Sequence, residues 1–599
     1  MSLLAAVQPA KGASVHDLII GGLVGGALTF LVLWVCQAHR AGRIRWLGRL
    51  AAFSERVSGL PRWCALPSAI VGGSLTIAVF GFYWDVAKHI DTGRDPGPFG
   101  TAAHYPILVG LSGIALGGVV AVVLGSPRQL PTSVRITQDW HAPLGGVLVL
   151  LCGIFALAGF PLDDVWHRLF GQDVTLWGPT HVLMVGGASL ATLGMWVLLV
   201  EGRRAKIAEA GGTPPHEPWF LRMRTIAAGG AFLLGLSSLQ GEFDYGVPQY
   251  QLVFHPILLM LAAGIGLTAA RIRIGRGGAL YSVGFWLVVR GLLALVIAGP
   301  LGRSTPHFPL YIAEALCVEL VAATMGTERP LRFAAVSGAL IGTVGLAAEW
   351  AWSHVWMPLP WPSTLLPEAA ILGFAAAVSG ALLGGLIGRA LTSRADSPPV
   401  SHWVGIAAGA TAVFCIAFPM PMTSSPLTAQ ITVRPAGPGH VQETVRLADP
   451  RRAHDAQWFT ATAWQGGSLV VDRLKHVGAG VWRTTQPIPV GGKWKSLVRL
   501  ENGRALMAAA VSMPADAAIP APGVPLRSGP HAFVKDKRLL QREAVGGSDT
   551  LKIPAYLLLL VIVCVWLAAM TWGLRRLEGS ARPPARGRPP RTPKVAVPA

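Results

Sequence analysis

Segments of about twenty apolar residues recur along nearly the whole of this 599-residue chain. An α-helix needs roughly twenty residues to cross the hydrocarbon core of a bilayer, where only helices and closed barrels satisfy their own backbone hydrogen bonds. Hydrophobic residues make up 52% of the sequence and charged residues only 13%. We therefore predict a membrane-embedded all-α bundle of about 13 transmembrane helices, arranged as repeated hairpins. Their approximate ranges are 17–37, 64–83, 104–125, 142–160, 181–200, 224–241, 252–270, 279–300, 308–326, 332–350, 366–391, 402–419 and 553–574.

The basic residues indicate how the chain crosses the membrane. The formal net charge is +20, which in a soluble protein would favour nucleic acid as a partner. Here the basic residues fall in alternate loops, as is typical of loops that stay in the cytoplasm. We therefore expect no nucleic-acid partner. We place the N-terminus outside the membrane and the C-terminus in the cytoplasm.

One hydrophilic segment differs from the rest. It consists of short alternating runs such as AQITVRP, WFTATAW and KSLVRL, separated by glycine, proline and aspartate turns. This pattern is typical of an antiparallel β-sandwich of about seven strands. We expect four parts: a membrane domain over 1–421, an extracytoplasmic β-sandwich over 422–552, a last transmembrane helix over 553–574, and a disordered basic tail over 575–599.

Two stretches between apolar segments carry the same three polar residues. WDVAKHIDTGRDPGPFGTAAH contains Asp85, His89 and His104, and DDVWHRLFGQDVTLWGPTH contains Asp163, His167 and His181. In each stretch the aspartate and the first histidine are four residues apart, so both lie on one face if the preceding helix continues through them. The second stretch has one loop residue fewer. Both stretches fall on the predicted outer side of the membrane.

The pattern weakens in three later hairpins, which suggests an internal repeat. Aligning the first turns of the inward-going helices gives one column of potential ligands: His104, His181, His255, Glu314 and Glu368. The outgoing helices end on further acids, Glu242 with Asp244 in one hairpin and Glu349 in another, and His354 follows Glu349. We therefore expect Glu242, His255, Glu349, His354 and Glu368 to be candidates for a second metal site.

A single histidine or aspartate at a membrane interface is most often a solvated loop group or a helix cap. The repeated combination favours metal binding instead, because an aspartate and a histidine one turn apart can converge with a histidine of the neighbouring helix on one ion. Mixed imidazole and carboxylate ligands suit copper, zinc, iron or manganese, whereas a thiolate site is disfavoured because the six cysteines form no CxxC pair.

Two apolar segments contain ionisable residues near their middle. Arg290 and Glu319 are each expensive to bury alone, so a structural ion pair is the simpler interpretation. A proton or ion path through Glu314, Glu319 and Arg290 is the alternative.

The two trios resemble the copper site in the membrane subunit of the particulate methane and ammonia monooxygenases, at Asp85, His89 and His104 and again at Asp163, His167 and His181. That resemblance implies copper. The stretch GVWRTTQPIPVGGKWKSLVRL resembles periplasmic β-sandwich domains that handle copper. As a whole the chain resembles a family of bacterial multi-pass membrane proteins of actinobacterial type. That resemblance implies the plasma membrane of a bacterium and no activity.

Three functions are compatible with these residues. The first is a membrane metalloprotein with an outward-facing site, with copper most expected and zinc or iron as alternatives. It would act in metal-dependent oxidation or in metal handling with an extracytoplasmic protein or metal carrier as partner. The second is an ion- or proton-coupled transporter. The third is a scaffold that displays the β-sandwich to partners.

Overall fold

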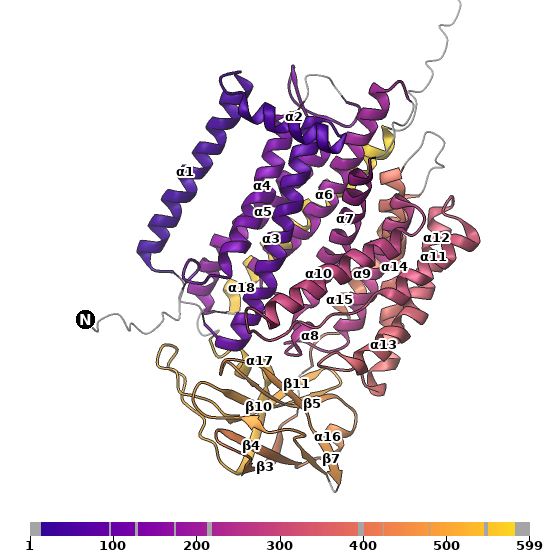
Figure 1. Ribbon diagram of the computed structural model, residues 1–599. Coiled ribbons are helices and arrows are strands. Elements are labelled where there is room, and N and C mark those ends of the chain that lie inside the picture. The colour runs from indigo at the N-terminus through magenta and orange to yellow at the C-terminus, as the bar shows by residue number, and fades with distance from the viewer. Residues whose placement is uncertain are drawn as a thin grey trace, which may run out of the picture.

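The apolar segments form a bundle of long helices, and a β domain lies at one end of it (Figure 1). The computed structural model describes residues 13–94, 97–125, 130–172, 175–212, 218–392, 401–422, 425–478, 480–543 and 549–580. The predicted disordered tail therefore lies largely outside the described residues. Its first residues instead continue the last helix, which ends at Gly579.

Ten helices of the described chain are long and apolar enough to cross a membrane. This confirms the prediction of a multi-pass, mainly helical membrane protein. The spans are α1 (Val15–Arg40), α3 (Arg62–Thr92), α4 (His104–Val123), α5 (Leu144–Phe170), α6 (Pro179–Glu209), α9 (Phe254–Ile274), α10 (Gly278–Ala298), α12 with α13 (Pro330–Leu340 and Leu346–Val355, joined by a π-helical turn over Ile341–Gly345), α14 (Leu366–Thr392) and α18 (Asp549–Gly579).

Three further predicted spans form helices that do not meet this description: α7 (Trp219–Ser237), α11 (Ile312–Met325) and α15 (His402–Ala417). The largest difference concerns α11, which has 14 residues where the predicted span covers 308–326. At 1.5 Å per residue it measures roughly 21 Å, well short of the roughly 30 Å hydrocarbon core. Pro306 and Pro309 explain the late start, because proline has no N–H for a helix interior.

Helix α2 (Trp46–Ser58) is not among the predicted helices; it follows α1 at the end of the bundle away from the β domain (Figure 1). Its large exposed apolar residues are Trp46, Leu50, Phe53 and Val57. These positions follow the helical period and so lie on one face. An exposed apolar face on a helix rich in arginine is typical of a helix that lies in the membrane surface.

Carboxylates of neighbouring helices satisfy backbone N–H groups at several helix starts in the bundle. Glu201 of α6 accepts hydrogen bonds from the N–H groups of Leu144 (3.1 Å) and Gly145 (2.7 Å), where α5 begins. Glu319 of α11 does the same at the start of α10, with Gly277 (3.0 Å) and Ala279 (2.9 Å). The first N–H groups of a helix have no partner within the helix, so a carboxylate from a neighbouring helix replaces water there.

The β domain is a single antiparallel sheet of ten strands in the order β6-β5-β10-β11-β12-β3-β4-β8-β7, with β9 paired to β4. The strands are β3 (Leu427–Pro435), β4 (His440–Leu447), β5 (Ala456–Trp464), β6 (Val470–Arg473), β7 (Lys475–Gly478), β8 (Val481–Arg483), β9 (Ile488–Pro489), β10 (Lys495–Asn502), β11 (Ala505–Ser512) and β12 (Gly529–Lys535). Short helices α16 (Arg451–His454) and α17 (Asp536–Leu540) accompany it. A separate hairpin, β1 (Val134–Thr137) with β2 (Trp140–Ala142), lies in the membrane domain.

This sheet differs from the two-sheet sandwich of about seven strands that the sequence pattern predicted. β12 pairs with β11 on one side and with β3 on the other, and so joins the two halves into one sheet. The edge strands β6 and β7 are separated only by Leu474, so the sheet is nearly closed on itself. Apolar residues from both halves fill the interior, among them Val445 and Val498.

The β domain packs against the bundle through buried polar contacts. Arg499 of β10 is 1% exposed, pairs with Asp536 at 2.7 Å and donates to the carbonyl oxygen of Pro248, between α8 (Gly241–Tyr245) and α9, at 2.5 Å. Glu501 of the same strand accepts from the N–H of Leu252 at 3.1 Å. The domain is therefore held directly on the helix ends beneath it.

One buried acid makes the stability of the β domain depend on pH. Glu443 of β4 is fully buried, and its carboxylate oxygens make no hydrogen bond to any described residue. Burial, with a smaller contribution from Asp472, raises the pKa of Glu443 to about 8. Between its ordinary value near 4.3 and about 8 the folded state binds more protons than the unfolded one, so the free energy of unfolding falls as pH rises, by up to roughly 1.4 kcal/mol per pH unit.

Glu443→Gln should therefore flatten this pH dependence and stabilise the domain at pH 8. The measurement is the unfolding transition of the β domain between about pH 5 and pH 8. Asp449→Asn, which changes an exposed carboxyl group, is the control and should leave the slope as in the wild type. An unchanged slope in Glu443→Gln would contradict the assignment.

Candidate metal centres

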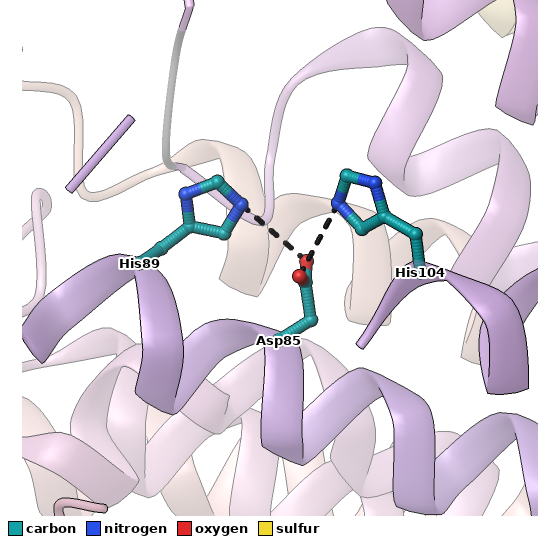
Figure 2. A group of neighbouring side chains, drawn as sticks. All are labelled: Asp85, His89 and His104. Atoms are coloured by element: carbon teal, nitrogen blue, oxygen red, sulfur yellow. Dashed lines mark ion pairs between the residues drawn. The ribbon is translucent and has the colours of Figure 1, made fainter. Parts of the chain in front are cut away.

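Asp85, His89 and His104 lie together and form the first trio (Figure 2). Asp85 and His89 are one turn apart on α3, and His104 is the first residue of α4. The Nε2 atom of His89 lies 3.5 Å from one carboxylate oxygen of Asp85, and the Nε2 atom of His104 lies 3.2 Å from the other. The three side chains are 16–17% exposed, so water still reaches the group.

Asp163, His167 and His181 form the second trio with almost the same geometry. Asp163 and His167 are one turn apart on α5, and His181 lies in the first turn of α6. The Nε2 atoms of His167 and His181 lie 3.6 Å and 3.4 Å from the two carboxylate oxygens of Asp163. Each set of three residues that the sequence pattern singled out is therefore close together in space.

Both trios depend on a helix that runs further than its apolar segment. α3 and α5 continue about ten residues beyond the predicted ends, and each ends three residues after its trio histidine. The residues that follow these ends are Gly93 (φ 87°) and Gly171 (φ 77°). A positive φ suits glycine, which often ends helices in this way. Their N–H groups donate to the carbonyl oxygens of His89 and His167, at 3.0 Å and 2.9 Å.

Backbone carbonyls orient the third residue of each trio. The Nδ1 atom of His104 lies 2.9 Å from the carbonyl oxygen of Pro98, and that of His181 lies 2.6 Å from the carbonyl oxygen of Thr175. A carbonyl can only accept a hydrogen bond, so Nδ1 carries the proton and Nε2 points at the aspartate. Metal-binding histidines are oriented by the same kind of hydrogen bond on the nitrogen away from the metal.

This orientation creates a need for positive charge. In neutral His104 or His181 the lone pair of Nε2 faces a carboxylate oxygen, which is repulsive unless a cation lies between them. A second proton on the imidazole or a metal ion bound to both groups supplies that cation. In each trio three donor atoms lie within 4.8 Å of one another. Ligands about 2.1 Å from one ion lie at most about 4.2 Å apart, so metal binding needs at most a small contraction.

Both trios face one cavity of about 480 Å³. The ring of Phe160, which precedes Asp163 on α5, packs edge-on against His104 of the first trio, with ring centres 5.9 Å apart. Phe160 also lines the cavity, so a side chain from the helix of the second trio forms the cavity wall beside the first trio. An ion in either trio would thus be near the same bound molecule.

The β domain completes this cavity, which the sequence did not indicate. Trp464 and Gln465, at the end of β5, are among the lining residues. The N–H groups of Gln465 and Gly467 donate to the carbonyl oxygens of Ile90 and Asp91, at 3.0 Å and 2.9 Å. These carbonyls belong to the last turn of α3, directly after His89, so the β domain holds the end of a ligand-bearing helix. Nothing in the sequence pairs residues so far apart.

Glu242 and His255, two of the candidates for a second site, do not converge on one point. Glu242 accepts hydrogen bonds from the N–H groups of Leu176 (2.8 Å) and Gln249 (2.9 Å). It therefore fixes the loop that orients His181. His255 is buried in α9, where its Nδ1 atom accepts a hydrogen bond from the Trp361 indole at 3.0 Å.

The other three candidates also have structural partners. Glu349 accepts from the N–H groups of Leu310 (2.9 Å) and Tyr311 (2.6 Å), just before α11. His354 is exposed, with its Nδ1 atom 2.9 Å from a carbonyl oxygen of its own helix. Glu368 pairs with Arg504 of the β domain at 2.7 Å. Within the described residues, only the two trios bring three donors together.

The residues of the expected proton path are likewise apart. Arg290 is fully buried and pairs with Asp244 at 2.7 Å, so a structural ion pair does form, but its partner is not Glu319. Glu319 pairs with Arg271 of α9 at 2.7 Å. Glu314 lies against Gly345 in the π-helical turn. The described contacts give no chain of ionisable groups that joins Glu314, Glu319 and Arg290.

Comparison of the chain with protein-family models, with curated proteins and with solved structures found no match. The interpretation of the site therefore depends on its own geometry.

Thr180→Val should weaken metal binding at the second trio. The Thr180 hydroxyl donates to Asp163 at 2.6 Å, whereas Ala103 holds the corresponding place before His104 in the first trio. Removing such a supporting hydrogen bond lowers metal affinity by roughly 10–100-fold. The measurement is metal titration in an Asp85→Ala background, in which only the second trio keeps its three donors.

Thr192→Val is the matched control. Thr192 is on the same helix and lines the cavity that the trios face, but its hydroxyl donates to the carbonyl oxygen of Ser189. Equal affinities for Thr180→Val and Thr192→Val would contradict the role given to Thr180.

Proposed function

We propose that this chain is an integral membrane metalloprotein that binds one transition-metal ion in each trio. The observation that carries the proposal is the duplicated geometry. Two separate hairpins each hold one aspartate against two histidines, with the third residue's Nδ1 atom engaged by a backbone carbonyl six residues earlier. A chance cluster of interfacial groups would not repeat both the set of donor residues and the backbone hydrogen bond that orients one of them.

Copper is the ion we propose first, with zinc and iron as alternatives. Two imidazoles and one carboxylate suit each of these ions, and a two-histidine, one-carboxylate set is also the donor set of non-haem iron(II) oxygenases. Copper is favoured by the resemblance of the motif to the monooxygenase copper site. Three protein ligands leave coordination positions open for water or another molecule.

The shared cavity supports a chemical role for the ions over a purely structural one. Structural metal sites are typically closed by four protein ligands, whereas a site with three protein ligands can bind a reactant. Both trios lie on the wall of the same cavity. We therefore propose that the ions act in metal-dependent oxidation or in the handling of metal delivered by an extracytoplasmic partner, with the site on the outer face of a bacterial plasma membrane.

The transporter alternative has less support. It depends on a continuous path of ionisable groups, and Arg290 and Glu319 are each engaged with another partner, Asp244 and Arg271. The scaffold alternative leaves the duplicated trios without a role.

Metal analysis of the purified protein tests the proposal. The wild type should carry about two equivalents of metal, predominantly copper after growth with copper, zinc and iron present. Asp85→Ala and Asp163→Ala should each retain about one equivalent, and the double variant almost none, because each aspartate lies between both histidines of its trio. Purification must avoid chelators and histidine tags.

His354→Ala is the control, since His354 is an exposed histidine of the same membrane domain and belongs to neither trio. It should retain about two equivalents. Less than about a tenth of an equivalent in the wild type would refute metal binding, and full occupancy in the double variant would place the ions elsewhere.

A further inference from the structure

The cavity extends well beyond the trios into the membrane-spanning part of the bundle. Its wall includes Gly72 and Gly73 of α3, Met195 of α6, Ala227 of α7 and Phe285 of α10. We call this extension the apolar arm. From His181 to Met195 the wall follows α6 for 14 residues, which at 1.5 Å per residue corresponds to roughly 20 Å. Asp85 and Gly72 are separated by a similar distance along α3.

The apolar arm and the trio end differ sharply in polarity. All the ionisable residues that line the cavity are found near the trio end: Asp85, His89, His104, Asp163, Asp164, His167, His181 and Glu242. The hydroxyl groups along the apolar arm are turned to backbone carbonyl oxygens of the helices. Thr76 donates to the carbonyl oxygen of Gly72 and Thr192 to that of Ser189, and the Ser189 hydroxyl lies within hydrogen-bond distance of the carbonyl oxygens of Val185 and Gly235. The arm thus offers few polar groups to water, and apolar cavities of this kind bind apolar molecules.

The apolar arm also reaches the outer surface of the bundle. Gly73 and Thr76 line it and are exposed, and both lie near the middle of the α3 span. At that depth the surrounding medium is the hydrocarbon core of the bilayer. A molecule dissolved in the bilayer can therefore enter from the side, whereas a polar solute would have to enter at the trio end.

We propose that this cavity binds an amphiphile with one long apolar chain, of the fatty acyl or isoprenoid type, whose chain occupies the apolar arm and whose polar end lies between the two trios. The division of the cavity into a polar end and a long apolar arm matches such a molecule. The volume of about 480 Å³ lies within the range of sites for small ligands. The encounter of the polar end with metal rests on the proposed function, but binding of the chain does not.

Gly72→Leu tests the proposal by filling the apolar arm. A Cβ atom built on Gly72 meets nothing within 4 Å, so the new side chain has room to extend into the cavity without displacing a neighbour. Gly284→Leu is the matched control, because Gly284 also lies on a span with nothing within 4 Å but does not line the cavity. Gly73→Leu provides a second blocking variant if Gly72→Leu is not produced.

The measurement is binding of two labelled probes, hexadecanol and geranylgeraniol, to the delipidated full-length protein, with metal content determined on the same samples. We expect at least one probe to bind the wild type and Gly284→Leu with equal affinity. Its affinity for Gly72→Leu should be at least roughly tenfold lower, because the added side chain occupies the volume that the apolar chain of the probe needs. Metal content should be equal in all three. Preference for hexadecanol indicates an acyl ligand, and preference for geranylgeraniol an isoprenoid one.

Equal binding by Gly72→Leu and wild type, or no binding of either probe to the wild type, would overturn the proposal. The variant with both Asp85→Ala and Asp163→Ala separates the two proposals. It should lose metal and still bind the chain, so a failure of metal binding and a failure of chain binding are observed independently.

Discussion

The bundle depends on carboxylates that accept hydrogen bonds from backbone N–H groups of other segments. Within a bilayer these groups find no water, and each helix start leaves several of them without an intrahelical partner. Glu201, Glu319 and Glu349 supply the missing acceptor at the beginnings of α5, α10 and α11. Asp85 and Asp163 are the acids that face imidazoles instead. A carboxylate that accepts from backbone N–H groups is structural here, whereas one that faces two imidazoles is a candidate metal ligand.

This distinction explains which parts of the site could be predicted from the sequence. The Asp-x3-His spacing is local, so a single helical turn makes both side chains neighbours, and the third ligand follows at the start of the next helix. The partners of Glu242, Glu349 and Glu368 come from loops or from the β domain, and no short pattern reveals them. These residues therefore resembled ligands in the sequence although each has a structural partner.

The fold, too, could be predicted where it depends on local sequence and not where it depends on contacts between distant segments. Apolar length alone predicts the long spans, because burial in lipid requires it. Apolar length fails at α11, where two prolines delay the start of the helix. In the β domain the alternating pattern predicts strands but not their pairing, and so it did not predict that β12 joins two halves into one sheet. The contact of Gln465 and Gly467 with the end of α3 joins residues far apart in the chain, so it depends on tertiary packing alone.

The last helix, α18, has a consequence for how the protein is made. Its fully buried Trp566 packs against Phe155 of α5, with ring centres 6.0 Å apart, and Arg204 of α6 donates to the carbonyl oxygen of Leu577 at 2.7 Å. The hairpin that bears the second trio thus obtains its final neighbour only after the β domain has been synthesised. The first trio also waits for the β domain, because Gln465 and Gly467 donate to the last turn of α3, so both trios reach their finished surroundings late in biogenesis.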